Sequence, residues 1–433
     1  MYKKRNAILA VLIVTALLAF QPPAKASDNA DLRKKVENLE TQLQEVLNLL
    51  HSKETKPAGQ APKKSISTTE GPEIKVDEDK LRFETKEDEH GLQRLGNLDK
   101  MHFFGYGELH SNTKIGPTEN KIDLHRFVLG WGYDFTDKIE LRAELDFEHA
   151  FAEPEVEYAY LDFLFNENVN ARAGIVLMPI GVLNQHHEPP LFNSVERPEV
   201  YRVIIPTSWF EGGAGLYGKF NPGFSYEFYV TSTPNAEGFS GSTGFRGGRG
   251  KLQDNKAGDV GATGRLQYTG VPGFRLGTSF FFGNTGQGDQ DVDGGTLSLI
   301  EADAKYSIEG IDLEGLFAFT NLSDAGSINT NLGKTVGEQM LGWYVEGAYH
   351  LFHHLIPDTK HDLIAFARFE DFNTQHSMPN GFSADPENDR NTVTFGLSYK
   401  PIPQIAFKAD YMANWNQANA GIDQFNLGIG FYY

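Results

Sequence analysis

The chain has 433 residues and a formal net charge of −19 at pH 7. A polyanion argues against nucleic-acid binding, which requires a basic surface, and the absence of cysteine excludes disulfides and thiolate chemistry. Beyond residue 26 no apolar run reaches about 18 residues, which argues against membrane-spanning helices. The 45 Gly, 32 Phe and 17 Tyr favour aromatic-rich strands joined by tight turns.

Residues 1–26 have the features of a secretory signal peptide. A basic start at residues 3–5 precedes an apolar stretch at residues 7–20, and Ala24 and Ala26 supply the small residues that a signal peptidase recognises. The apolar stretch is too short for a membrane span. We therefore expect the chain to be exported.

Residues 27–51 predict a periplasmic coiled-coil helix. Apolar residues alternate at spacings of four and three, as a coiled-coil seam requires. The seam consists of Leu32, Val36, Leu39, Leu43, Val46 and Leu50. About three heptads are marginal for a lone helix in water, so we expect this segment to oligomerise. The alternative is an amphipathic helix that lies on the chain's own barrel. Residues 52–100, rich in Pro and Lys and then in Asp and Glu, predict a flexible linker.

From residue 101 to residue 433 the apolar pattern changes to a period of two. In residues 139–148 apolar side chains alternate with charged ones, among them Glu140, Arg142 and Glu144. Charged residues at every second position cannot all face a packed core, but they can face a water-filled lumen. The strands run about ten residues or longer, which is membrane length at the tilt of a barrel. The pattern predicts an all-β fold, a transmembrane antiparallel β-barrel.

The connections between these strands are alternately short and long, as in a barrel whose turns lie at one end and whose loops lie at the other. Counting through gives about sixteen strands, with residues 352–361 as an unusually long turn. The C-terminal strand alternates to its last residue and is typical of an outer-membrane assembly signal. That signal consists of Phe425, Leu427, Ile429, Phe431 and Tyr433. We therefore expect an outer-membrane location, in contact with lipid and lipopolysaccharide.

Several motifs between residues 101 and 270 resemble the phosphate-selective porin O and P family. They are residues 104–110, 123–127, 171–174, 179–181, 187–190, 196–198 and 205–213. The resemblance implies a trimeric sixteen-stranded porin that passes small solutes, and a short coiled coil before the barrel also fits that family. The predicted lumen mixes both charge signs, which argues against strong anion selectivity.

The loop at residues 179–210 is long enough to suggest a function, and it is the third external loop. We expect it to fold inward and narrow the pore, because it carries both charge signs and apolar residues that could hold it to the wall. The alternative is an external flap that covers the barrel or packs against a neighbouring subunit. The predicted pore-lining and constriction residues are Arg126, Glu140, Arg142, Glu144 and Arg172 from strands, and Glu196, Arg197, Glu199 and Arg202 from the loop.

Other motifs predict no chemistry of their own. His186 and His187 are adjacent and point opposite ways in an extended segment, so no metal site is expected. The Gly-rich residues 241–250 lack the frame of a phosphate-binding loop and predict a mobile external loop. No nucleophile motif indicates an enzyme, and no cofactor is expected. The leading hypothesis is a porin for passive diffusion of small hydrophilic solutes or ions; the alternative is a non-conducting barrel that anchors the coiled coil.

Overall fold

The computed structural model describes residues 100–433, apart from 117–119, 221, 254, 289–293 and 357–358. The predicted signal peptide, coiled-coil seam and almost all of the linker lie outside these residues. Within them, no helix has the length and apolar character that a membrane crossing needs.

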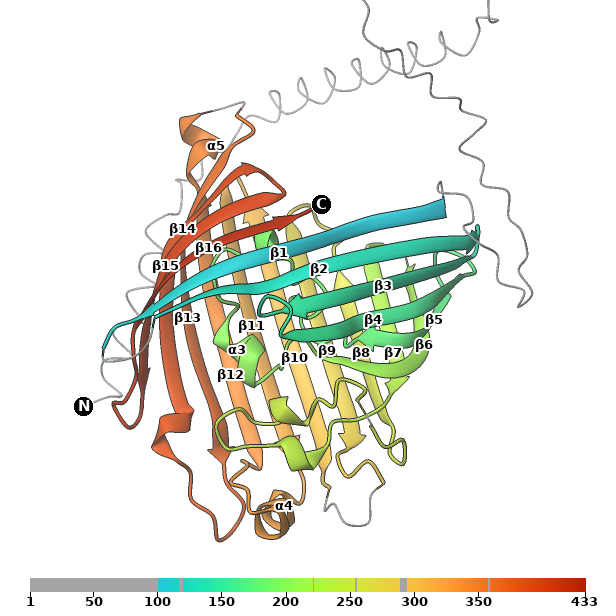
Figure 1. Ribbon diagram of the computed structural model, residues 1–433, viewed down its shortest axis with the longest axis vertical. Helices are drawn as coiled ribbons and strands as arrows, with labels where there is room; N and C mark the ends of the chain where they lie inside the picture. Colours follow the sequence, from blue (N-terminus) through green and yellow to red (C-terminus); the bar gives the residue numbers. More distant parts are fainter. Residues whose placement is uncertain (1–99, 117–119, 221, 254, 289–293, 357–358) are drawn as a thin grey trace, which may run out of the picture. The chain divides into compact units, whose positions relative to one another are not determined.

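The described residues form one closed antiparallel barrel of sixteen strands (Figure 1). Each strand pairs with its neighbours in sequence, and the first strand pairs with the last, so the sheet has no free edge. The fold class and the strand count predicted from the sequence are confirmed. The strands are β1 (Met101–Lys114), β2 (Lys121–Thr136), β3 (Ile139–Glu148), β4 (Glu153–Leu164), β5 (Asn170–Leu177), β6 (Phe210–Phe220), β7 (Phe224–Thr231), β8 (Gly261–Tyr268), β9 (Phe274–Asn284), β10 (Thr296–Ile308), β11 (Ile311–Leu322), β12 (Gln339–His350), β13 (Asp362–Ser377), β14 (Asp389–Ile402), β15 (Ile405–Asn416) and β16 (Gln424–Tyr432).

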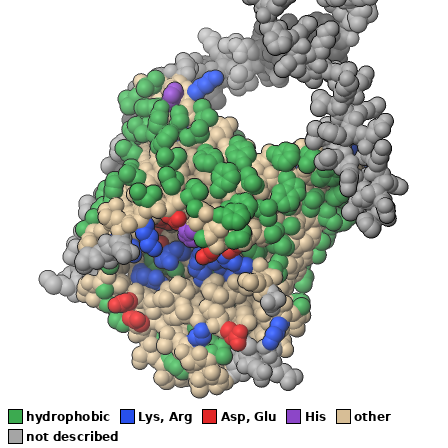
Figure 2. All heavy atoms as spheres, viewed as in Figure 1, with side chains coloured by type: hydrophobic (Ala, Val, Ile, Leu, Met, Phe, Trp, Pro, Cys, Tyr) green, Lys and Arg blue, Asp and Glu red, His purple; other side chains and the backbone are tan. Residues whose placement is uncertain are grey.

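The alternation of the sequence decides which side chains face outward. In β9, Phe280 and Phe282 are exposed whereas Phe281, between them, is buried inside the barrel. The same holds in β16, where Phe425, Leu427 and Ile429 are exposed at every second position. Hydrophobic side chains cover a broad band of the outer face (Figure 2). An apolar surface of this extent is stable against lipid rather than water.

Short turns and long loops lie at opposite ends of the barrel. The long turn predicted at residues 352–361 overlaps the short helix α5 (Leu351–Leu355), which connects β12 to β13. At the opposite end, the second loop (residues 149–152) is short, whereas the third loop (residues 178–209) and the fourth loop (residues 232–260) are long.

The hydrophobic core lies inside the barrel, between these two long loops and the inner wall of β9 to β13. The third loop contributes Val200, Ile204 and Trp209, all fully buried, and the fourth loop contributes Phe239 and Phe245. The wall side chains of this core are Phe281, Leu297, Leu299, Leu316, Ala318, Leu322, Met340, Tyr344 and Phe372. Burial of each large apolar side chain stabilises the arrangement by about 1.5–3 kcal/mol. The core therefore holds both loops against one side of the lumen.

Candidate pore constriction

The neck of the third loop is closed by one buried amide. The Asn184 side chain donates to the carbonyl oxygens of Met178 and Trp209, both at 2.7 Å, and its oxygen accepts from the Trp209 N–H. Because Met178 and Trp209 also pair through their backbones, the loop leaves and re-enters the wall at one place. Everything between them is thereby directed into the barrel as a unit.

The far part of this loop is held by hydrogen bonds to side chains of β13 and β15. The Val195 N–H donates to the Asp410 carboxylate at 2.5 Å, and Arg368 donates to the Ser194 hydroxyl at 2.8 Å. Lys408 donates to the Ser194 carbonyl oxygen at 2.8 Å. These wall side chains are buried and lie on β13 and β15. Residues 194 and 195 therefore lie inside the barrel, attached to β13, which the apolar core also reaches through Phe372, and to β15.

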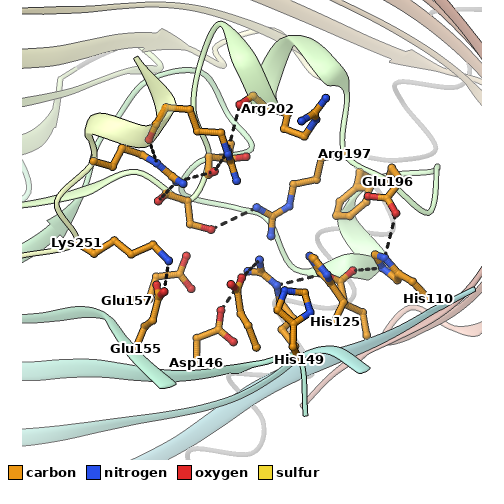
Figure 3. A pocket seen from close by; sticks show the side chains of 18 of the residues that line it. His110, His125, Asp146, His149, Glu155, Glu157, Glu196, Arg197, Arg202 and Lys251 are labelled. Atoms are coloured by element: carbon orange, nitrogen blue, oxygen red, sulfur yellow. Dashed lines mark hydrogen bonds and ion pairs between the residues drawn. The ribbon is translucent and has the colours of Figure 1, made fainter. Parts of the chain in front are cut away.

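A cavity of about 210 Å³ remains between the two long loops and the wall formed by β1 to β4. Its loop side carries cations and its wall side carries carboxylates and imidazoles, which face each other (Figure 3). The cations are Arg197, Arg202, Arg246, Arg249 and Lys251, and the acidic groups on the strands are Glu108, Asp146, Glu148, Glu155 and Glu157. Lys and Arg side chains are also visible in a hollow on this face of the molecule (Figure 2). We call this space the charged pocket.

The arginines of the fourth loop are held by backbone carbonyl groups of the third loop. Arg249 donates to the carbonyl oxygens of Thr207 and Ser208 at 2.8 and 2.6 Å, and Arg246 donates to that of Thr207 at 2.6 Å. Burial and the neighbouring Arg249 lower the pKa of Arg246 to about 9, so it remains a cation at neutral pH. The expectation of a mobile external loop at residues 241–250 was wrong, because the buried Phe245 and these hydrogen bonds pack the loop onto its neighbour.

On the wall side, one buried arginine holds three carboxylates. Arg126 lies 3.2 Å from Glu108, 3.5 Å from Asp146 and 2.8 Å from Glu148. Removal of either partner of such a buried pair would leave an uncompensated charge. The strand side of the pocket is therefore acidic, with the guanidinium of Arg126 between three carboxylates.

A histidine connects this wall to the third loop. His110 lies between the carboxylates of Glu108, at 3.0 Å, and Glu196, at 3.2 Å. Burial raises the pKa of Glu196, but the hydrogen bond and charge of His110 outweigh it and lower that pKa to about 2. Glu196 is therefore ionised at any physiological pH.

Two further side chains of the charged pocket, those of His125 and Glu157, lie at β-bulges that the sequence pattern did not predict. β-Bulges interrupt the register at His125 in β2 and at Glu157 in β4, and each bulged residue lines the charged pocket. Glu157 and Tyr106 contact His187 of the third loop, at 3.1 and 2.7 Å. Bulges re-aim side chains near functional sites. The only signal in the sequence was the density of acidic and histidine residues in these strands.

No family model matches the chain. It is 34% identical over 332 residues to an "Uncharacterized protein" of Aquifex aeolicus (strain VF5), an alignment that covers 71% of this chain and 74% of the other. The chain belongs to the same family as this Aquifex protein.

Solved structures of outer-membrane proteins share the fold of the present chain. A loop L8 deletion mutant of OmpT from Vibrio cholerae superposes with a TM-score of 0.53 at 11% identity, over 77% of this chain and 99% of that one. OmpF of Salmonella typhi, in complex with daunomycin, gives 0.53 at 13% identity, over 77% and 97%. The outer membrane channel DcaP of Acinetobacter baumannii gives 0.51 at 11% identity, over 77% and 97%. At these identities the similarity concerns the fold alone: a porin-like barrel.

The structure brings together some of the predicted constriction residues. Arg126, Glu196, Arg197 and Arg202 all line the charged pocket. Glu144 is buried next to Glu157 and His187.

The remaining predicted residues lie elsewhere. Glu199 pairs with Arg202 at 2.5 Å and lines a cavity of about 940 Å³ that also includes Arg202 and the ends of β14 to β16. Glu140 and Arg142 form an ion pair at 2.8 Å beside the turn between β2 and β3, and Arg172 pairs with Asp162 at 2.8 Å. The structure does not place these last three in the charged pocket. A period of two indicates the face of a strand, but not the height of a residue along a tilted barrel.

Proposed function

We propose that this protein is an outer-membrane porin through which small hydrophilic solutes or ions diffuse passively. The observation that carries this proposal is the charged pocket, where the inward-folded third loop faces the strands across a polar space. Apolar side chains attach that loop to β9 through β13, whereas the charged pocket lies on the side of β1 to β4. The charged pocket would be a route for water and solutes beside the loop, and the cavity of about 940 Å³ at the ends of β14 to β16 would adjoin it through Glu196 and Arg202, which line both.

The charges of the pocket support a transverse field rather than a filter for one sign. Arg197 extends from the third loop toward the middle of the pocket (Figure 3), where its guanidinium donates to the Ser208 hydroxyl at 3.4 Å. Opposite, Glu108 and Asp146 keep the wall acidic. A hydrated solute would pass between the two surfaces with its dipole aligned across the pore. We therefore propose weak charge selectivity, and we extend the resemblance to phosphate-selective porins to the architecture only.

The assembly follows from the same proposal. The predicted coiled coil would join three copies into a homotrimer and place the N-terminal segment in the periplasm, while the apolar outer face contacts lipid and lipopolysaccharide. The chain would act as a channel and not as an enzyme. A narrow, largely buried lumen also supports a second candidate, a non-conducting barrel that anchors the coiled coil, since Glu157 and Arg368 at the level of the loop are almost fully buried.

Single-channel recording tests the proposal against this second candidate. The purified mature protein would be inserted into planar bilayers, and its reversal potential would be measured under a salt gradient. We expect conductance steps in groups of three with a small reversal potential. Silent bilayers, obtained with protein whose folding is verified by heat-modifiable gel mobility, would overturn the porin proposal and favour the anchor.

A further inference from the structure

Three potential metal ligands meet at the rim of the charged pocket. They are Asp123 and His125 of β2 and His149 of the second loop, and their ligand atoms all lie within 4.8 Å of one another. His149 Nδ1 is 2.6 Å from Asp123 Oδ2, and His125 Nδ1 is 3.6 Å from the same oxygen. The two histidines line the pocket, and all three side chains are partly accessible.

Two irregular backbone features create this meeting. The bulge in β2 lies at His125, between the paired residues Leu124 and Arg126, and it turns the imidazole toward the lumen, where it stacks on His110 with ring centres 4.8 Å apart. His149 begins a turn in which three consecutive residues, none of them glycine, have positive φ angles of 51°, 54° and 80°. Side chains disfavour this left-handed conformation, and such strain concentrates at functional sites.

Hydrogen bonding alone leaves this arrangement incomplete. The short contact between His149 and Asp123 is one hydrogen bond, whereas His125 faces the same carboxylate oxygen from beyond hydrogen-bonding distance. Metal–ligand distances near 2.0–2.2 Å in a tetrahedral site put ligand atoms roughly 3.3 Å apart. The two measured separations lie on either side of that value. Small shifts of the side chains would therefore bring all three atoms to one ion.

We propose that Asp123, His125 and His149 bind a divalent transition-metal ion such as Zn²⁺ at the mouth of the pocket. Two imidazole nitrogens and one carboxylate oxygen select Zn²⁺ and its neighbours over Mg²⁺ and Ca²⁺, which prefer oxygen ligands. Three protein ligands leave a coordination position open toward the pocket, for water or for a passing solute. The strand residues that line the pocket include five carboxylates and one arginine, Arg126, and this excess of acidic groups favours a cation there. A bound ion would add positive charge to the acidic side of the pore.

The test is an isothermal calorimetric titration with ZnCl₂. It uses the whole mature protein, folded and solubilised in detergent. We expect one Zn²⁺ per chain and no binding of MgCl₂ at the same concentrations. His149→Asn removes the imidazole but keeps a residue that tolerates the left-handed turn, and it should weaken binding at least about tenfold. His125→Gln should do the same.

A matched control lies at the other end of the barrel. His102 also contacts a carboxylate, Asp134, at 2.6 Å, but the structure shows no second histidine there among the described residues. His102→Asn should leave the affinity for Zn²⁺ unchanged. Absence of Zn²⁺ binding by the folded parent protein, or equal binding by the parent and both pocket variants, would overturn the proposal. Because calorimetry needs no conductance, this outcome is independent of whether the barrel is a channel.

Discussion

The two sides of the lumen have the same strand geometry and opposite chemistry. On β9 to β13, the inward residues beside the third loop include the apolar side chains of the core, such as Phe281, Leu299 and Leu316. On β1 to β4, the inward residues at the charged pocket are ionic, as with Glu108 and Arg126. Both sides alternate with a lipid-facing apolar row. Inward apolar residues on β9 to β13 therefore mark where the third loop packs by burial. Inward charged residues either hold the loop by hydrogen bonds, as Arg368, Lys408 and Asp410 do, or line the charged pocket beside it.

The largest effect that this comparison predicts is at the centre of the acidic wall. Arg126→Ala would leave Glu108, Asp146 and Glu148 without their cation, and we expect it to destabilise the barrel by about 3–5 kcal/mol. Urea unfolding of the protein in lipid vesicles would measure the loss. Because protonation removes the uncompensated charge of a buried carboxylate, the deficit should shrink as the pH is lowered. A deficit independent of pH would show that lost packing, not charge, is responsible.

A truncation in the apolar wall should also lower the stability of the barrel, but the loss should not depend on pH. Phe281→Ala removes a side chain that contacts Trp209 of the third loop, with ring centres 4.9 Å apart, and should cost about 3 kcal/mol. We also expect the third loop to become sensitive to protease and the single-channel current to become noisier.

The neighbouring phenylalanine supplies a matched control for that variant. Phe282 is the adjacent residue on β9 but faces outward and is 58% exposed. Phe282→Ala removes the same atoms from the lipid side, so the loop should remain protected from protease. Equal protease sensitivity in the two variants would contradict the proposal that the inward-facing Phe281 holds the third loop.

Sequence periodicity predicted both walls but not the way in which they meet the loops. The faces of the strands, the strand count and the position of the third loop follow from local patterns, because each depends on residues a few positions apart. The bulges at His125 and Glu157 and the left-handed turn at His149 depend on register with a neighbouring strand. The packing of residues 241–250 onto the third loop depends on contacts between distant parts of the chain. For the same reason Arg142 and Arg172 could be assigned to the lumen, but not to a height within it.

A charge reversal compares a pocket residue with a residue elsewhere in the lumen. Arg197→Glu should shift the reversal potential clearly toward cation selectivity, because it replaces one of the cations that face the acidic wall with a carboxylate. Arg142→Glu makes the same change near the short-turn end, beside Asp134 and Glu140, and should shift the potential much less. Equal shifts would mean that the pocket does not control selectivity. Recordings at high salt should reduce both shifts, because ions screen exposed charges.

The smallest expected effect concerns the pair of His110 and Glu196, which joins the acidic wall to the third loop. The pKa of Glu196 is about 2 in the folded protein, below the value of about 4.3 for an unperturbed Glu. A group whose pKa falls on folding stabilises the folded state above the unfolded pKa, and this contribution is lost as the pH falls from about 4 to about 2. Because the Glu196 side chain is 31% exposed, we expect the contribution to stay below about 1 kcal/mol. Glu196→Gln should remove it at pH 7 and flatten the acid dependence of loop protection from an acid-active protease such as pepsin between pH 4 and 2. Glu199→Gln, three residues further along the same loop and paired with Arg202, is the control, because it leaves the link to the wall intact. An identical acid profile in both variants would mean that Glu196 does not join the loop to the wall.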